Sequence, residues 1–171
     1  MRKWVLGLLF LGLASLVYSQ QPQREVNEVI LEGVTVTSPN FDYLAMVQDR
    51  NTPETVKGLE RKAASFVLME SPVYNKIDKA YEVFFSNSKG RIVATYDDGG
   101  KIISSVEKFA NVVVPGPIRN TVYNAYPEWT MSENTYRVTY FHNKGVKKTY
   151  HLQISKGDET KNLKVTWKAT R

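Results

Sequence analysis

The stretch YEVFFSNSKG at residues 81–90 is followed, 55 residues later, by YRVTYFHNKG at residues 136–145. In both stretches aromatic and β-branched residues alternate with polar ones before a Lys-Gly pair, a pattern typical of a half-buried strand that enters a turn. Tyr81 matches Tyr136 and Gly90 matches Gly145 without a gap. The repeated pattern predicts that one structural unit occurs twice in the chain.

Each copy is preceded by a segment with helical spacing and followed by two further alternating segments. The first helix is expected around residues 52–67 and the second around residues 116–127. The apolar stripe of the first helix consists of Val56, Leu59, Ala63, Phe66 and Val67. The later strands are expected near residues 91–96, 101–109, 146–155 and 162–169, joined by short turns such as DDGG at 97–100.

The order of these segments predicts an α+β protein made of tandem helix-plus-antiparallel-sheet repeats. Both helices are expected on one face of the sheet, so that the other face lies in solvent. Tyr136, Tyr140, Tyr150 and Trp167 fall on alternating strand positions, where filling the core is the usual role of an aromatic side chain. The expected division of the mature chain is a leader and strand at residues 20–49, a first repeat at 50–110 and a second repeat at 111–171.

Residues 1–19, MRKWVLGLLFLGLASLVYS, follow the plan of a secretory signal peptide. Arg2 and Lys3 give a positive start, an apolar run follows, and cleavage is expected near Ser19-Gln20. A membrane anchor is the alternative, but the run is shorter than the roughly 20 residues that span a bilayer, and polar residues follow at once. The expectation is therefore a periplasmic or secreted protein with no stable membrane span after cleavage.

Composition excludes several classes of chemistry. The chain has no cysteine, so disulfides, thiol catalysis and thiolate metal sites are ruled out. Loss of Arg2 and Lys3 would leave 21 of the 23 basic side chains against 17 acidic ones, a net charge of +4. This excess is mild and spread along the strands, so nucleic acid is not an expected partner.

No catalytic, metal or cofactor site emerges from the remaining residues. The two histidines, His142 and His151, lie in strand or turn contexts without neighbouring ligands or a catalytic triad. Asp97 and Asp98 stand in a turn, where Asp is favoured for reasons of backbone geometry. The sequence therefore predicts a protein that is not an enzyme and carries no cofactor.

The solvent face of the last strands is the candidate site for a partner. Its side chains are polar and basic, and a protein of the cell envelope is the partner we expect there. An ordinary solvated face is the alternative reading of the same pattern. His151 is the one group on this face whose charge could change near neutral pH. The candidate residues are Lys147, Thr149, His151, Gln153, Lys164, Thr166 and Lys168, with Arg137 and Thr139 beside them.

Three motifs give the chain a family resemblance: YDDGGKI at 96–102, YPEW at 126–129 at the end of the second helix, and the KGD turn at 156–158 between paired strands. With the order of elements over residues 50–170, they resemble the PepSY-like periplasmic proteins of Bacteroidota, grouped with the β-lactamase-inhibitor-protein fold. The resemblance implies tandem repeats, export and a binding or inhibitory role without catalysis. It supplies no catalytic residue.

Two other functions remain open at this point. A structural or accessory envelope protein could pair the expected strand VILEGVTVTS, residues 29–38, with the sheet edge of a partner. A nicotinate-nucleotide adenylyltransferase-type enzyme is a remote alternative, because exported proteins of similar layout can carry that label. Such an enzyme needs a Gly-His pair at a helix start and a parallel sheet, and the sequence shows neither.

Overall fold

The computed structural model describes residues 40–167. The expected signal peptide, the strand expected at residues 29–38 and the candidate residue Lys168 lie outside these described residues. None of the described helices is long and apolar enough to cross a membrane.

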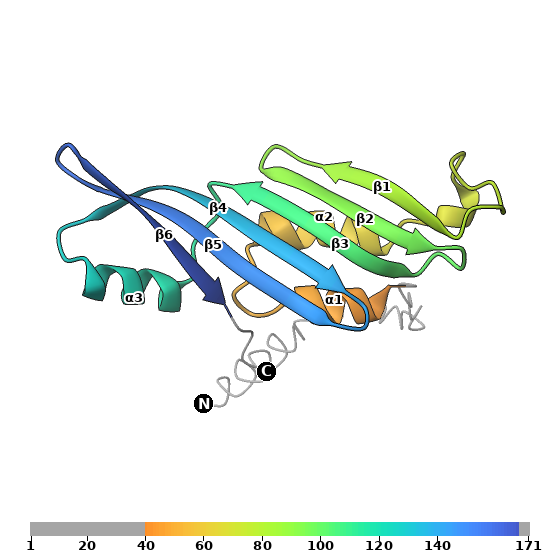
Figure 1. Ribbon diagram of the computed structural model, residues 1–171, viewed down its shortest axis with the longest axis horizontal. Helices are drawn as coiled ribbons and strands as arrows, with labels where there is room; N and C mark the ends of the chain where they lie inside the picture. The colour runs from red at the N-terminus through yellow and green to blue at the C-terminus, as the bar shows by residue number, and fades with distance from the viewer. Residues whose placement is uncertain (1–39, 168–171) are drawn as a thin grey trace, which may run out of the picture. The chain divides into compact units, whose positions relative to one another are not determined.

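A single six-stranded antiparallel sheet forms the body of the described chain, with its strands in sequence order (Figure 1). The prediction of an α+β protein with an antiparallel sheet is thus confirmed. The elements are α1 (Phe41–Val47), α2 (Glu54–Ala64), the 3-10 turn η1 (Leu68–Glu70), β1 (Ala80–Ser86), β2 (Gly90–Asp97), β3 (Ile102–Ala110), α3 (Gly116–Ala125), β4 (Thr130–Phe141), β5 (Gly145–Lys156) and β6 (Glu159–Trp167).

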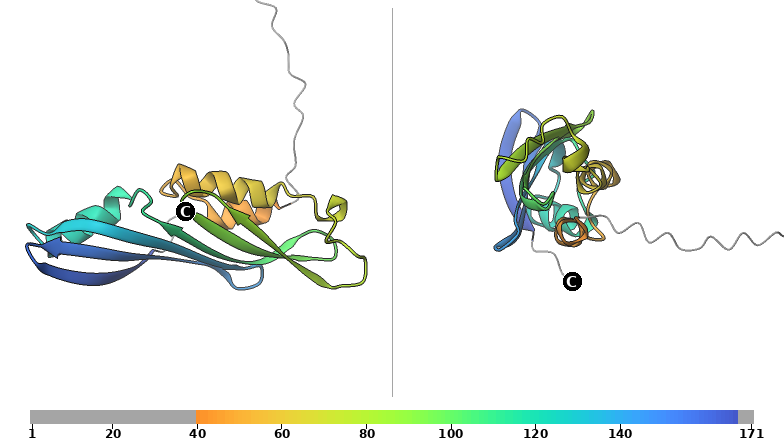
Figure 2. Two further views of the ribbon diagram at one scale, coloured as in Figure 1. Left: turned by 90° about the horizontal axis from the view of Figure 1, so that it is seen from above. Right: turned by 90° about the vertical axis from the view of Figure 1, so that its right-hand side faces the viewer.

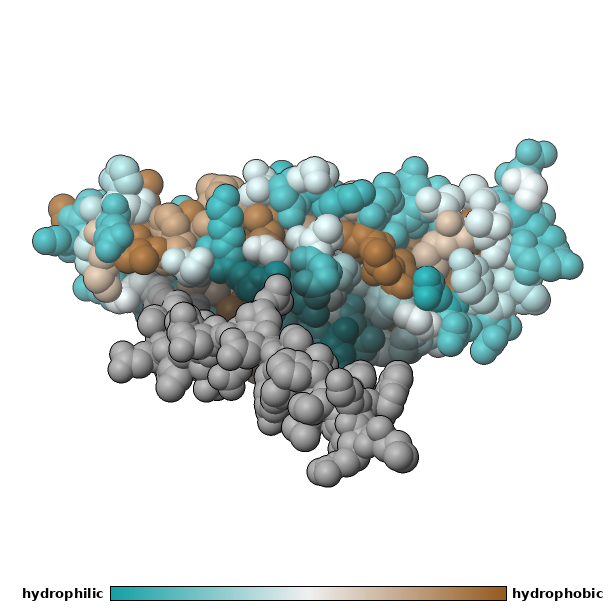
Figure 3. All heavy atoms as spheres, turned by 180° about the vertical axis from the view of Figure 1, so that it is seen from behind, coloured by the Kyte–Doolittle hydropathy of each residue, from teal (hydrophilic) through white to brown (hydrophobic). Residues whose placement is uncertain are grey.

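The three helices of residues 40–167 lie on one side of the sheet, as the turned views show (Figure 2). We call the sheet surface beneath them the helix-covered face and the opposite surface, which no described helix covers, the outer face. In Figure 1 the outer face is turned toward the viewer, with α2 behind the strands. Seen from behind, the helix side of the molecule is largely hydrophilic, with separate hydrophobic patches (Figure 3).

Helix α1 was not predicted from the sequence, since residues 20–49 were expected to form a leader and a strand. Asn40, which precedes α1, is 2% exposed and joins three segments. Its amide nitrogen donates to the carbonyl of Gly100 at 3.2 Å, and its Oδ1 accepts the N–H of Ile102 at 2.6 Å. The same amide nitrogen also donates to the carbonyl of Ala64 at 3.4 Å. One buried amide therefore anchors α1 to the end of α2 and to the β2–β3 turn.

The predicted apolar stripe of α2 is largely confirmed, but the helix is shorter than expected. Val56, Leu59 and Ala63 are buried against the sheet. The helix ends at Ala64, so Val67 lies beyond it and is 47% exposed. Phe66 stays partly buried because its ring packs edge-on against Phe85, with 5.6 Å between the ring centroids.

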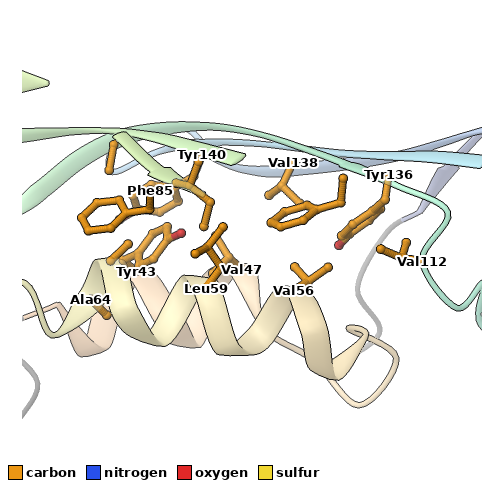
Figure 4. Close-up of a cluster of buried hydrophobic side chains, with 14 of the residues drawn as sticks. Tyr43, Val47, Val56, Leu59, Ala64, Phe85, Val112, Tyr136, Val138 and Tyr140 are labelled. Carbon is orange, nitrogen blue, oxygen red and sulfur yellow. The ribbon is translucent and has the colours of Figure 1, made fainter. Parts of the chain in front are cut away.

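The helix-covered face of the sheet carries the core, which is rich in tyrosine (Figure 4). Tyr136 and Tyr150 stack across β4 and β5 with 4.5 Å between their ring centroids, and both are 1% exposed. Tyr140 meets Tyr43 of α1 edge-on at 5.3 Å. The predicted core role of Tyr136, Tyr140 and Tyr150 is confirmed, and Trp167 is partly buried against the same core.

The two glycines at matching positions of the quoted stretches have different structural roles. Gly145 has a φ of 84°, in the left-handed region that glycine adopts without steric cost. Gly90 is required by space, because a Cβ there would lie 2.2 Å from the carbonyl oxygen of Lys108. The two turns are therefore more similar in sequence than in backbone geometry.

Candidate functional site on the outer face

A row of three basic side chains crosses the middle of the outer face. In the strand register Arg91 of β2 lies opposite Lys108 of β3, and Lys108 lies opposite Arg137 of β4. All three side chains are exposed. We call these three residues the basic row. Like charges directly opposite one another on neighbouring strands destabilise a sheet, so this arrangement does not follow from the stability of the fold.

Two further lysines extend the positive charge over β5 and β6. Lys147 and Lys164 are exposed on the same face, and within residues 40–167 neither they nor the basic row form an ion pair. The acidic residues Glu82 and Glu133 belong to other rows of the register, toward the margins of the face. The centre of the outer face is therefore positive and uncompensated by the described side chains.

A shallow hollow of about 420 Å³ lies beside the basic row, over β4, β5 and β6. His151 stands at its centre in the register, between Thr135 of β4 and Lys164 of β6. Most of its lining side chains point outward by the alternation of the strands. The lining residues are Glu133, Asn134, Thr135, His151, Leu152, Gln153, Asn162, Leu163 and Lys164.

The surroundings of His151 lower the pKa of its imidazole. Partial desolvation lowers the pKa of this histidine below its ordinary value, and the charges of Arg137 and Lys164 lower it further. The imidazole is therefore neutral at pH 7 in the free protein. An anionic group placed in the hollow would have the opposite effect and favour the imidazolium.

The predicted partner-binding residues are partly brought together in this region. His151, Gln153 and Lys164 line the hollow, while Lys147 and Thr166 are exposed elsewhere on the same face. Thr149, which was expected to be exposed on this face, is only 5% exposed. This short side chain lies between Arg137 and Thr166 on the flanking strands, and neighbours on both sides shield it.

An apolar row runs next to the basic row on the outer face. Phe84 of β1, Val93 of β2 and Val106 of β3 lie opposite one another in the register. Phe84 is 71% exposed and Val106 is 56% exposed, although both stand on regular strands. We call these three residues the apolar row. Exposed apolar residues that occur side by side indicate a contact surface more strongly than scattered ones do.

The helix-covered face holds a second set of charged residues, buried beneath α1 and α2. Glu107 of β3 is 1% exposed, and its Oε1 accepts hydrogen bonds from Tyr43 and Ser105, both at 2.8 Å. Glu60 of α2 is fully buried. Both of its carboxyl oxygens, with Oε2 of Glu107, have no hydrogen-bond partner among the described residues.

Burial controls the protonation of these two carboxyls. Desolvation raises the pKa of Glu60 to about 9, and the neighbouring Glu107 adds to the shift. Desolvation also raises the pKa of Glu107, although the hydrogen bonds from Ser105 and Tyr43 oppose that change. Glu60 is therefore protonated at neutral pH, and the pair does not place two full negative charges in the core.

Lys148 on β5 completes this buried set. Its ammonium is 1% exposed and donates to Oδ2 of Asp49, in the α1–α2 loop, at 2.6 Å. Burial alone would raise the pKa of Asp49, but the hydrogen bond and charge of Lys148 hold it below its ordinary value. Asp49 also accepts the N–H of Asn51 at 2.7 Å, which shapes the loop. The pair thus fixes the α1–α2 loop to the sheet.

The lining of the hollow on β4–β6 contains neither Glu60 nor Glu107. Within residues 40–167, no three His, Cys, Asp or Glu side chains are grouped as metal ligands. Asp97 has a backbone role, because its Oδ1 accepts the N–H groups of Gly99 at 3.0 Å and Lys101 at 2.8 Å.

Comparison of the chain with models of protein families, with curated proteins and with solved structures gave no match. The family resemblance therefore depends on the motifs of the sequence.

Proposed function

We propose that the protein is an exported, non-catalytic binding or inhibitory protein of the PepSY-like type, which contacts a protein partner of the cell envelope through the outer face of its sheet. The observation that carries this proposal is the hollow over β4–β6, lined by His151, Gln153 and Lys164 and bordered by uncompensated positive charge. A face that only needed to be solvated would have no reason to place like charges directly opposite one another at its centre.

The placement of the titratable groups supports a role without catalysis. The carboxyls with the most strongly perturbed protonation, Glu60 and Glu107, lie on the helix-covered face and away from the hollow. A catalytic acid or base must reach its substrate directly or through one water molecule. The antiparallel sheet also differs from the parallel sheet on which adenylyltransferase chemistry would be built.

The order of the elements is in line with the proposed tandem repeat. Helix α2 precedes β1–β3 and helix α3 precedes β4–β6, so a helix and three strands occur twice in the same order. Tyr81, near the start of β1, and Tyr136, in the middle of β4, are both buried, and Phe85 matches the buried Tyr140. The pattern of residues 1–19 supports export.

Site-specific photo-cross-linking in the native cell envelope tests this function. A photoreactive residue in place of Asn162, which lines the hollow, should give a discrete cross-linked partner. The same residue in place of Lys62, exposed on α2, serves as the matched control and should not give that product. Identical products from both positions, or none from Asn162, would contradict the assignment of the outer face as the binding surface.

A further inference from the structure

We infer that the outer face recognises an acidic amphipathic helix of its protein partner, and that the basic row of Arg91, Lys108 and Arg137 is the part that selects it. This inference rests on the proposed function, because it names the chemistry of the segment that the same face would bind. It also adds two residues, Arg91 and Lys108, that lie outside the hollow.

The charge of the partner follows from the arrangement of the basic row. Three cations stand directly opposite one another on β2, β3 and β4, without an ion pair among the described residues. Each opposed pair destabilises the free sheet. Carboxylates of a partner would remove this repulsion and form charge-assisted hydrogen bonds with the two guanidinium groups.

The spacing of the basic row favours a helix over an extended segment. Neighbouring strands lie about 4.8 Å apart, so the basic row offers a cation at roughly that interval. An α-helix advances about 5.4 Å per turn, which nearly matches it, whereas alternate side chains of an extended strand are about 6.7 Å apart. Acidic residues that recur once per helical turn can therefore meet Arg91, Lys108 and Arg137 in succession.

The apolar row explains why the partner helix should be amphipathic. Phe84, Val93 and Val106 form a row across β1–β3 that runs parallel to the basic row across β2–β4. On the two shared strands, β2 and β3, the rows are two residues apart, which corresponds to about 6.7 Å. A helix about 10 Å wide that lies across the strands covers both rows at once. Its acidic stripe would face the basic row while an adjacent apolar stripe covers Phe84 and Val106.

Peptide binding by the full-length protein tests this inference. The probe is a fluorescent helical peptide with Glu at i, i+4 and i+8 beside an apolar stripe, and its control is a scrambled peptide of identical composition. Anisotropy titrations should show that the ordered peptide binds at least tenfold more tightly than the scrambled one. The binding should weaken as the salt concentration rises, because the contacts are exposed charges.

Two variants with the same change of charge distinguish a specific effect of the basic row on peptide binding from the effect of net charge alone. Lys108→Glu should weaken binding of the ordered peptide at least tenfold, whereas Lys62→Glu on α2 should change it less than twofold. Equal effects of the two variants would overturn the inference. Equal binding of the scrambled peptide would overturn the choice of a helix, and binding to phosphatidylglycerol vesicles without peptide binding would assign the face to membranes.

The cross-linking experiment keeps this inference distinct from the proposed function. If the Asn162 cross-link persists in the Lys108→Glu background, the partner uses the hollow without the basic row, and only the inference fails. If no partner is cross-linked although the ordered peptide binds selectively, the proposed envelope function fails while the basic row keeps its specificity.

Discussion

The two faces of the sheet consist of alternate residues of the same strands, yet they differ in whether their charged groups are paired. On the helix-covered face Lys148 is paired with Asp49 at 2.6 Å, and the pKa of Glu60 is raised to about 9, so it stays neutral. On the outer face Arg91, Lys108 and Arg137 stand together unpaired among the described residues. On the helix side the charge of Lys148 is paired and Glu60 is protonated, whereas the basic row on the outer face has no ion-pair partner among the described residues.

Breaking the buried ion pair should have the largest effect on stability. Asp49→Ala leaves the ammonium of Lys148 buried without its hydrogen-bonded carboxylate, a change that typically destabilises a protein by about 3–5 kcal/mol. Chemical denaturation should show this loss in the free energy of unfolding. Lys79→Ala, which removes an exposed pair with Asp98, should stay close to the wild type. A small effect of Asp49→Ala would mean that the paired charges do not hold the α1–α2 loop.

Neighbouring phenylalanines on β1 allow a direct comparison of the two faces. Phe85 is 7% exposed and packs against Phe66, so Phe85→Ala should destabilise the protein by about 3 kcal/mol through lost burial and a cavity. Phe84 is 71% exposed on the outer face, so Phe84→Ala should change stability by less than about 0.5 kcal/mol. Thermal unfolding of the two variants checks this contrast, and similar losses would show that Phe84 has a structural role.

The buried carboxyls should make stability depend on pH. The folded-state pKa of Glu60 lies above its unfolded value, so its contribution is fully present below about pH 4.5 and is lost as the pH rises toward about 9. Within this window one such group lowers stability by at most about 1.4 kcal/mol per pH unit. Glu60→Gln, which cannot ionise, should make the decline between pH 6 and pH 8 shallower, as measured by thermal unfolding. An unchanged slope would show that Glu60 is already ionised in the folded protein.

Much of the fold could be predicted because alternation in the strands follows directly from burial on one face. The strands around Tyr136 and Tyr150 and the stripe of α2 were recognised in this way. Helix α1 was missed because seven residues give too short a periodic pattern, and because Asn40 is anchored by contacts with segments distant in the sequence.

The candidate site could be predicted only in part, because a row across a sheet depends on the register of strands distant in sequence. Lys164 and His151 were found from the alternation of single strands. Arg91 and Lys108 were not, since their pairing with each other and with Arg137 is a property of the assembled sheet. Lys148 was not assigned to the core, although it shares the parity of Tyr150 and Leu152, because charged residues are rarely expected there.

The smallest predicted change in stability tests whether the basic row stabilises the fold or is present for binding. Lys108→Glu places a carboxylate between Arg91 and Arg137, replacing two repulsive contacts with two attractive ones, and should raise the free energy of unfolding by about 0.2–1 kcal/mol. Lys62→Glu makes the same change of charge near the C-terminal end of α2, where a cation is favoured, so it should lower stability slightly. Urea denaturation at low salt measures both, and the gain from Lys108→Glu should shrink as added salt screens the exposed charges.

If Lys108→Glu instead destabilises the protein, the basic row contributes to the fold itself and needs no partner to explain it. A variant that folds more stably while it loses the ordered peptide would show that the outer face maintains an unfavourable arrangement for the sake of binding.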